Sequence, residues 1–384
     1  MRRLWILTLL LFLSVVPVYG AEPSVGALGA ALVDGKTGRL LWGKNAEEEM
    51  VMASTTKIMT AIVVLENADL EEIVTVSKNA ANQPEVNMNL SEGEQWRLGD
   101  LLDVMMLRSY NDVAVALAEH VSGSVEAFCA EMTQKAEAVG AMSTVFGSPN
   151  GLDSNLPMEE HHSTAYDMSL IASYALENDV FCEIIKKPAV SIGEVTGRRQ
   201  VDATNADRFL SEYQGARGIK TGFTNKAGHC FVGAAERDGV ELVTTVLASG
   251  WGSRGKEGKW KDTKALMEYG FATFFPYTVV EAQSVYQEEL PVIRSKTTSV
   301  PILFAEGFDG LFSEEEKERL RLECQLPEAL DAPIETGAVV GRVQVYLDQE
   351  CLAEIPLITG GHAETLSLSD WMAYVLSQWV DWLK

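Results

Sequence analysis

Strand-like patterns lie at both ends of a long helical stretch, and this order constrains the fold more than any other feature. Residues 26–43 alternate around a glycine-containing turn at 34–38, which predicts a β-hairpin. Two more strand patterns follow at 229–236 and 240–248, joined by a turn at 238–239. We therefore expect one α/β domain whose sheet is closed by its terminal segments.

The residues between these strands repeat their apolar side chains at helical spacing. From Ser54 onward, apolar residues recur every three or four positions, as on one face of a helix. Ser163 and Thr164 offer N-caps for an apolar helix that runs to Leu176. The other expected helices span 99–107, 112–121, 124–138 and 262–274.

After Pro276 the pattern changes to short β-rich stretches with turns between them. The expected strands lie within 279–290, 300–304, 339–347 and 351–357. We therefore expect a first domain over residues 21–275 and a smaller all-β domain over residues 276–365. The acidic run 314–316 is interpreted as a solvated face.

The first 20 residues have the parts of a secretory signal peptide. Arg2 and Arg3 supply a positive start, residues 4–18 are almost entirely apolar, and Gly20 precedes a plausible cleavage point. The apolar stretch is about 15 residues long, short of the roughly 20 that span a bilayer. We expect residues 1–20 to be removed as the chain is secreted across the cytoplasmic membrane; an uncleaved anchor is the alternative.

The last residues, 366–384, form an amphipathic pattern. Trp371, Trp379 and Trp382 gather with aliphatic residues on one helical side, while mostly acidic and polar residues gather on the other. Tryptophan rings suit the headgroup region of a membrane. Since a basic face is missing, binding would be mainly hydrophobic. We expect this helix to associate with the membrane surface; docking on the β domain is the alternative.

The composition of the chain disfavours a nucleic-acid partner and a zinc site. The 384 residues carry a net charge of −24, which disfavours nucleic acid, because phosphate binding needs clustered Lys and Arg. Five cysteines form no CxxC pair, and Cys129, Cys182 and Cys230 are expected as buried thiols. Adjacent His161 and His162 would point apart on a helix, so zinc is not expected. We predict no metal and no cofactor.

A serine and a lysine one helical turn apart form the first motif that carries chemistry. Ser54 stands where a helical pattern begins, and the unpaired N–H groups there favour developing negative charge. Lys57, three residues later, lies on the same helix face as Ser54. A serine hydroxyl needs a base to become a nucleophile, and a lysine is a base only if its pKa falls well below ~10.4. A second S-x-x-K, at 253–256, lies among glycines, where we expect no fixed geometry.

A lysine beside a strand pair supplies the second cation. Lys220 opens a K-T-G sequence near the strands, where a glycine lets a ligand's backbone approach closely. Burial and the nearby charge of Lys220 are expected to lower the pKa of Lys57, so that it accepts the Ser54 proton. Lys220, more open to the ligand, is expected to stay charged and bind a carboxylate. A second K-T-G, at 36–38, is explained by the hairpin turn. The set predicts acyl transfer without a metal.

The order of these motifs, with Ser109-Tyr110-Asn111 between them, resembles that of the D-alanyl-D-alanine carboxypeptidases, the low-molecular-mass penicillin-binding proteins related to serine β-lactamases. The similarity covers about residues 25–275. The matching segments are 53–61, 109–112, 150–153, 162–168, 218–224 and 227–228. The resemblance implies an α/β (α+β) DD-peptidase/β-lactamase-like domain with an antiparallel sheet and a helical cluster, followed by the smaller β domain and the C-terminal amphipathic helix.

The resemblance implies catalytic roles for matching residues. Ser54 would be the acylated nucleophile, Lys57 its proton acceptor, and Ser109 the relay of a proton to the leaving group. The backbone N–H groups of Ser54 and Phe223 would form the oxyanion hole. Tyr110 stands where a small residue is common in the family, which would narrow the cleft.

The resemblance also implies a substrate-binding set. Asn111 would hold the substrate amide, and Lys220 and Thr221 would bind its terminal carboxylate, with Gly222 and Phe223 beside them. Arg254 is a further candidate for a carboxylate contact, although the surrounding glycines leave its alignment open.

Three functions fit this set of residues. The leading one is a serine-type carboxypeptidase that removes the terminal D-alanine from peptidoglycan pentapeptide stems through an acyl-enzyme on Ser54, which β-lactam antibiotics would also acylate. A β-lactamase needs a glutamate that activates water, and Glu159 and Glu160 lie in the right stretch without the family's context. The third is a membrane-held penicillin-binding scaffold without useful turnover. We expect a location in the cell envelope.

Overall fold

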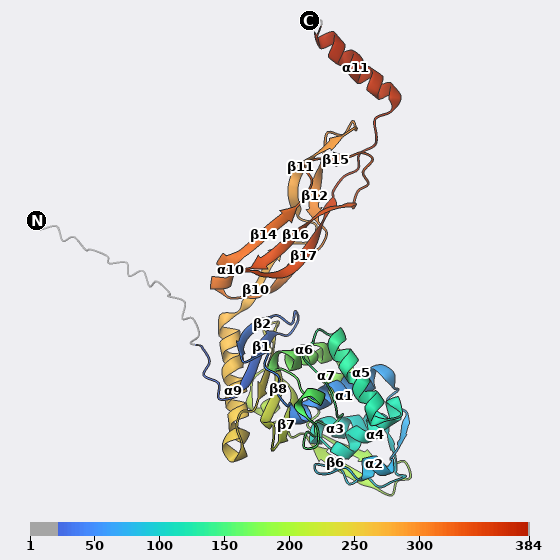
Figure 1. The fold of residues 1–384 in the computed structure, drawn as a ribbon, viewed down its shortest axis with the longest axis vertical. Helices are drawn as coiled ribbons and strands as arrows, with labels where there is room; N and C mark the ends of the chain where they lie inside the picture. Colours follow the sequence, from blue (N-terminus) through green and yellow to red (C-terminus); the bar gives the residue numbers. More distant parts are fainter. Residues whose placement is uncertain (1–21, 383–384) are drawn as a thin grey trace, which may run out of the picture.

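The computed structural model describes residues 22–382 as an α/β domain, a β-rich domain and a terminal helix, arranged along one long axis (Figure 1). The fold class predicted from the sequence is confirmed: a mixed domain with an antiparallel sheet precedes an all-β domain. The expected signal peptide, residues 1–20, lies outside the described residues.

A five-stranded antiparallel sheet in the order β2-β1-β9-β8-β7 organises the first domain. Its strands are β1 (Gly29–Asp34), β2 (Leu40–Lys44), β7 (Ala216–Thr224), β8 (Gly228–Arg237) and β9 (Val240–Leu247). β1 pairs with β9, so the predicted hairpin closes the sheet from the far end of the sequence. β7 lies at the edge, which leaves one side of this strand unpaired within the sheet.

Both faces of the sheet are covered by helices (Figure 1). In β1, Ala31 and Val33 belong to the core beneath the helical cluster, whereas Ala30 and Leu32 pack toward α9 (Gly252–Thr273). The cluster comprises α1 (Lys57–Asn67), α3 (Leu98–Arg108), α4 (Asn111–Ser122), α5 (Val125–Ala138), α6 (Ala165–Leu176) and α7 (Asp179–Lys186). The short elements are η1 (Ala53–Thr56), β3 (Ile73–Thr75), α2 (Lys78–Ala81), β4 (Gln95–Arg97), η2 (Met158–Glu160), β5 (Ala189–Gly193), β6 (Gln200–Thr204) and α8 (Phe209–Glu212).

Most predicted helices begin at the expected places. The Thr164 side chain caps α6 by accepting a hydrogen bond from the Asp167 backbone N–H at 2.9 Å. Ser163 does not cap this helix, because its hydroxyl is paired with the Thr144 hydroxyl. Cys129, Cys182 and Cys230 are buried free thiols, as expected.

The expectation of no fixed geometry for the glycine-rich segment 253–256 is wrong, and the helix expected at 262–274 begins earlier. The segment forms the first turns of α9, which begins at Gly252. A Cβ atom at Gly255 would lie 2.2 Å from the Gly250 carbonyl oxygen, and one at Gly258 would lie 2.8 Å from the Ser249 carbonyl oxygen. These glycines therefore allow close packing between helix and loop rather than flexibility.

The second domain contains a six-stranded sheet in the order β14-β16-β17-β12-β11-β15 and a two-stranded sheet of β10 and β13. The strands are β10 (Phe275–Val280), β11 (Val285–Ile293), β12 (Ser299–Phe304), β13 (Phe308–Phe312), β14 (Leu320–Gln325), β15 (Leu330–Asp331), β16 (Val339–Leu347) and β17 (Glu350–Thr359). Ile302, Val343, Val345, Ile355 and Leu357 are buried in its core, alternating along their strands.

The acidic run 314–316 is not a solvated face throughout. It opens α10 (Glu314–Arg319), where Ser313 and Glu316 form a capping box. Glu316 also receives a hydrogen bond from Arg39 at 2.9 Å, and the Arg39 guanidinium lies 4.6 Å from the centre of the Phe312 ring. Arg39, in the turn between β1 and β2, therefore binds the second domain, and Asp34 adds a contact by accepting a hydrogen bond from the Leu311 backbone N–H at 3.3 Å.

The terminal helix α11 (Leu368–Trp382) lies at the far end of the β-rich domain (Figure 1). Lys296 pairs with Asp370 at 2.6 Å near its start, while Trp371 and Leu376 are 56% and 65% exposed. Among residues 22–382, no single helix is long and apolar enough to cross a membrane; only α4 and α5 together, bent by 85°, meet that length and composition requirement.

Candidate active site

Ser54 and Lys57 meet at the start of the first long helix. Ser54 lies half-buried in the 3₁₀ turn η1, and Lys57 is the first residue of α1. The Lys57 ammonium lies 3.1 Å from the Ser54 hydroxyl oxygen and 2.5 Å from the Asn150 carbonyl oxygen. The Ser54 hydroxyl is also 3.4 Å from that carbonyl. The predicted nucleophile and base are thus within hydrogen-bond distance.

Burial and a neighbouring cation shift the ionisation of Lys57. Its side chain is completely buried, and this burial holds its pKa well below the ordinary value. The charge of Lys220 lowers the pKa further, while Asp112 opposes the shift. A lysine in this environment loses its proton far more easily than an exposed one, which is what a general base requires.

The turn between α3 and α4 brings the second motif to Lys57. The Asn111 side-chain oxygen accepts a hydrogen bond from the Lys57 ammonium at 2.9 Å, and its amide donates to the Glu85 carbonyl at 2.8 Å. Ser109 ends α3 in the left-handed conformation, with φ of 66°. Its hydroxyl oxygen is buried and makes no hydrogen bond within the described part of the chain. An unpaired buried hydroxyl is uncommon and is compatible with a role in proton transfer.

The third motif lies inside a strand of the sheet, whereas the sequence placed it only beside a strand pair. Lys220, Thr221, Gly222 and Phe223 all belong to the edge strand β7. A Cβ atom at Gly222 would lie 3.1 Å from the Ser54 backbone nitrogen, so this glycine lets the strand approach the nucleophile. Phe223 is 45% exposed and packs on His229, with ring centres 4.4 Å apart.

Lys220 differs from the expectation that it would be open and fully charged. It is only 3% exposed, and its ammonium donates to the Thr221 carbonyl oxygen at 3.2 Å. Burial lowers its pKa to about 7, with a further contribution from the charge of Lys259, while Asp207 opposes the shift. Lys220 therefore loses part of its charge near neutral pH, because the desolvation of its buried ammonium outweighs the opposing effect of Asp207.

Several residues hold the loops around this site in place, and the sequence analysis had assigned no role to them. Gly151, with φ of 82°, packs so closely that a Cβ atom there would lie 2.0 Å from the Ala53 carbonyl oxygen. Asp153 accepts a hydrogen bond from the Thr224 hydroxyl at 2.6 Å, which ties this loop to the end of β7. Asp112 anchors the opposite loop by accepting from the backbone of Met88 at 2.9 Å.

The competing candidates lie apart from this cluster. Ser253 and Arg254 are exposed in the first turn of α9, and Arg254 makes no hydrogen bond or ion pair with the described residues. Glu159 and Glu160 are exposed on η2 and form no hydrogen bond with Ser54 or Lys57.

Tyr110 is partly buried and packs against the main core. Within residues 22–382, no group of three His, Cys, Asp or Glu side chains is placed to hold a metal.

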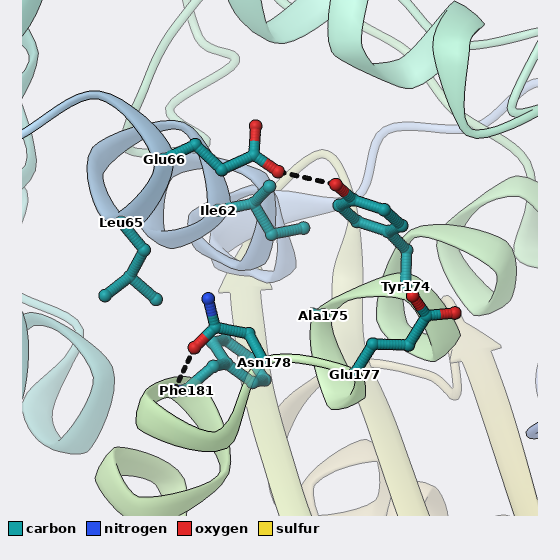
Figure 2. A pocket seen from close by; sticks show the side chains of 8 residues that line it. All are labelled: Ile62, Leu65, Glu66, Tyr174, Ala175, Glu177, Asn178 and Phe181. Carbon is teal, nitrogen blue, oxygen red and sulfur yellow. Dashed lines mark hydrogen bonds between the residues drawn. The ribbon is translucent and has the colours of Figure 1, made fainter.

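A separate pocket of about 220 Å³ lies between α1, α6 and α7 (Figure 2). Figure 2 shows Glu66 accepting a hydrogen bond from the Tyr174 hydroxyl, at 2.6 Å, on one side of the pocket. Asn178 accepts one from the Phe181 backbone N–H at 3.1 Å on another side. None of its lining residues belongs to the cluster around Ser54, so this pocket is not the candidate active site.

A protein-family model described as D-alanyl-D-alanine carboxypeptidase matches residues 18–250. The chain belongs to this family. A second model, described as the C-terminal domain of penicillin-binding protein 5, matches residues 274–365.

Relatives of this carboxypeptidase match it over most of both chains. D-alanyl-D-alanine carboxypeptidase DacC of Escherichia coli is 30% identical over 374 residues, covering 92% of this chain and 90% of that protein. DacF of Bacillus subtilis is 27% identical, covering 93% and 90%. The crystal structure of penicillin-binding protein 5 from Haemophilus influenzae, 25% identical, gives a TM-score of 0.74 over 90% of this chain and 99% of that one. The chain is therefore a serine peptidase, a D-Ala-D-Ala carboxypeptidase of the low-molecular-mass penicillin-binding type.

Proposed function

We propose that Ser54 is the acylated nucleophile and that Lys57 is its base. Neutral Lys57 takes the Ser54 proton while the serine oxygen attacks the carbonyl carbon of the penultimate D-alanine. The 3.1 Å separation between the two side chains supports this step most directly. The negative oxygen that forms is stabilised by the backbone N–H groups of Ser54 and Phe223, supported by the close approach of Gly222 to the Ser54 nitrogen.

Breakdown of the tetrahedral intermediate needs a proton on the leaving nitrogen. Ser109 passes the proton from Lys57 to the D-alanine amine, the carbon–nitrogen bond breaks, and D-alanine departs. Water then attacks the acyl-enzyme in the reverse sense, with Lys57 again accepting a proton, and Ser54 is released. The buried, unpaired Ser109 hydroxyl supports this role. A β-lactam acylates the same serine without losing its leaving nitrogen, because the remaining carbon atoms of the opened four-membered ring still join that nitrogen to the acyl group.

The substrate peptide binds along β7. Its terminal carboxylate is held by Lys220 and Thr221, and its amide by Asn111, whose side chain moves from the hydrogen bonds it makes in the free protein. The free edge of β7 supports this placement, because an extended peptide can add to a sheet edge through main-chain hydrogen bonds. The substrate is the pentapeptide stem of peptidoglycan ending in D-Ala-D-Ala.

Release of D-alanine from diacetyl-L-Lys-D-Ala-D-Ala tests this assignment. Ser54→Ala is expected to abolish both D-alanine release and labelling by a fluorescent penicillin. Ser253→Ala, in the second S-x-x-K sequence, is the matched control and should keep both activities. Labelling without D-alanine release by the wild-type protein would instead support a penicillin-binding scaffold, and rapid penicillin turnover would support a β-lactamase.

We further propose that residues 1–20 direct secretion and that α11 associates with the outer surface of the cytoplasmic membrane. The exposed Trp371, Met372 and Leu376 side chains support an apolar contact. Because the chain carries a net charge of −24, we expect binding to zwitterionic vesicles that anionic lipid does not strengthen. Vesicle flotation tests this: a Trp371→Glu, Leu376→Glu variant should stay in solution, and unchanged flotation of the variant would contradict the proposal.

A further inference from the structure

A buried histidine outside the three motifs joins the two segments that flank Ser54. His161 lies between η2 and α6 and is only 1% exposed. Its Nδ1 atom accepts a hydrogen bond from the Gly147 backbone N–H at 3.2 Å, and its Nε2 atom lies 3.5 Å from the Thr56 hydroxyl oxygen. Neither His161 nor Thr56 has a part in the catalytic steps proposed above, although Thr56 directly precedes Lys57.

The directions of these hydrogen bonds follow from their donors. Burial lowers the pKa of His161 to about 4, so at neutral pH the ring is uncharged and carries a single N–H. Because a backbone N–H donates to Nδ1, the ring hydrogen is on Nε2 and is donated to the Thr56 oxygen. The Thr56 hydroxyl donates in turn to the Ala53 carbonyl oxygen at 2.8 Å. His161 therefore reaches the residue before the nucleophile through one threonine.

Ala53 is held in a conformation that an alanine rarely adopts. Its φ of 49° lies in the left-handed region, and such strain persists only where surrounding contacts enforce it. The Thr56 hydroxyl binds its carbonyl oxygen, and Gly151 packs so closely on that oxygen that a Cβ atom there would lie 2.0 Å away. The Ala53 carbonyl and the Ser54 N–H belong to one planar peptide group. Fixing the carbonyl therefore also fixes the direction of the Ser54 N–H.

The second contact of His161 holds the loop that carries the Asn150 carbonyl. Gly147, whose N–H binds the ring, also packs tightly on the chain before His161, since a Cβ atom there would lie 2.5 Å from the Glu160 carbonyl oxygen. Three residues further on, the Asn150 carbonyl oxygen accepts a hydrogen bond from the Lys57 side chain at 2.5 Å. The loop is thus fixed at one end by His161 and contacts the base with the other.

The Asn150 carbonyl is one of two acceptors that orient the side-chain amine of Lys57. A neutral lysine has two N–H groups and one lone pair on its nitrogen. The Asn150 carbonyl oxygen and the Asn111 side-chain oxygen, at 2.5 and 2.9 Å, accept these two hydrogens. The lone pair is then left for the Ser54 hydroxyl, whose oxygen lies 3.1 Å away. A displaced Asn150 carbonyl would leave the lone pair without a fixed direction.

We propose that His161 is a positioning residue for acylation. Through Thr56 it orients the Ser54 N–H toward the oxyanion, and through the 147–151 loop it orients the lone pair of Lys57 toward the Ser54 hydroxyl. This inference rests on the proposed function, in which Ser54 is the nucleophile and Lys57 the base. Within the described structure His161 makes no hydrogen bond with either of them, so it acts only through these two links.

Two substitutions of Thr56 test the first link. Thr56→Val keeps nearly the same shape and loses the hydroxyl, so kcat for D-alanine release should fall about tenfold or more while KM changes little. Thr56→Ser keeps the hydroxyl and should retain a kcat within about threefold of the wild type. Each rate is divided by the amount of active site that penicillin labels at completion, so unfolded protein does not contribute to the difference.

Substitution of His161 tests both links together. The probe is a boronic acid whose boron replaces the carbonyl carbon of the penultimate D-alanine, which forms a tetrahedral adduct with an active serine. His161→Phe should weaken its binding in proportion to the loss of kcat/KM, because both depend on the tetrahedral state. Adding Thr56→Val should lower kcat by no more than about a further twofold, because the two residues act in series. His162→Asn is the matched control: its ring binds the Met158 carbonyl oxygen instead, and both quantities should stay unchanged.

A loss of kcat in Thr56→Val that is absent in Thr56→Ser, with parallel losses of kcat/KM and boronic-acid affinity in His161→Phe, would support the proposal. Effects confined to thermal stability, or effects that multiply in the double variant, would overturn it. If either His161→Phe or Thr56→Val fails to fold, the measurements on the other decide. Failure of the proposed function is recognised separately, because Ser54→Ala would then still be labelled by penicillin.

Discussion

At the scale of single residues, the proposed mechanism requires two lysines in opposite states of charge. Lys57 accepts a proton only when neutral, so acylation should fall as pH drops through its lowered pKa. Lys220 attracts a carboxylate only when charged, and its pKa in the free protein is about 7, so kcat/KM for a carboxylate substrate should fall as pH rises above that value. We therefore expect a bell-shaped dependence of kcat/KM on pH.

Substitution of Lys57, the proposed base, gives a prediction at the scale of single residues. Lys57→Met should slow acylation by a penicillin roughly 10²–10⁴-fold, the usual contribution of a general base. Its thermal stability should not fall, because an apolar side chain replaces a buried amine. Stopped-flow labelling measures the rate, and Lys78→Met, at an exposed lysine of α2, is the control. A rate within about threefold of the wild type would exclude Lys57 as the base.

Not every residue of the site could be found from the sequence. Ser54, Lys57, Ser109, Asn111 and Lys220 belong to side-chain motifs with fixed spacing. The Asn150 carbonyl that contacts both Ser54 and Lys57 is a main-chain group, and any residue carries one. The partial charge loss of Lys220 depends on burial by distant segments, which local sequence does not reveal.

At the scale of elements, the regular spacing of apolar residues predicted the helices and strands whose own sequences carry that spacing. The hairpin, the helices α1 and α3–α6, and the pair β8–β9 repeat apolar residues at a regular period. β7 does not, because glycines and charged residues interrupt it and its stability comes from pairing with β8. Similarly, Gly255 and Gly258 lower the helix propensity of α9, and it is their close contact with the 249–250 loop that explains them.

The loop that carries Asn150 gives a prediction at this scale. Gly151→Ala should destabilise the protein by several kcal/mol and greatly slow acylation, because its Cβ atom would collide with the Ala53 carbonyl next to Ser54. Gly93 has a similar φ of 84° with open space around it, so Gly93→Ala should cost only about 1 kcal/mol. Urea unfolding compares the two variants. Equal losses would show that backbone conformation alone, and not the contact with Ala53, requires Gly151.

At the scale of the whole molecule, Arg39 makes several of the contacts that link the two domains. Arg39 bonds to Glu316 and to the Leu311 carbonyl oxygen, and it stacks on Phe312. The sequence could not reveal this link, since the acidic run is typical of exposed helices and its partner lies 277 residues away.

Arg39→Ala should expose the junction around residues 274–280 to proteases and lower the free energy of unfolding by about 2–3 kcal/mol, because Glu316 is left partly buried and unpaired. Arg319→Ala removes an exposed ion pair with Asp348 and should cost less than about 1 kcal/mol. Penicillin labelling should be unchanged in both variants. Limited proteolysis with mass mapping measures the effect, and an Arg39→Ala junction as resistant as the wild type would contradict it.

The most direct test of the central claim is mass spectrometry of the intact protein after reaction with benzylpenicillin, followed by peptide mapping. We expect a mass increase of one penicillin molecule, located on Ser54, that is absent in Ser54→Ala and retained in Ser253→Ala. An adduct that persists in Ser54→Ala, or that maps to Ser253, would contradict the assignment of Ser54 as the nucleophile.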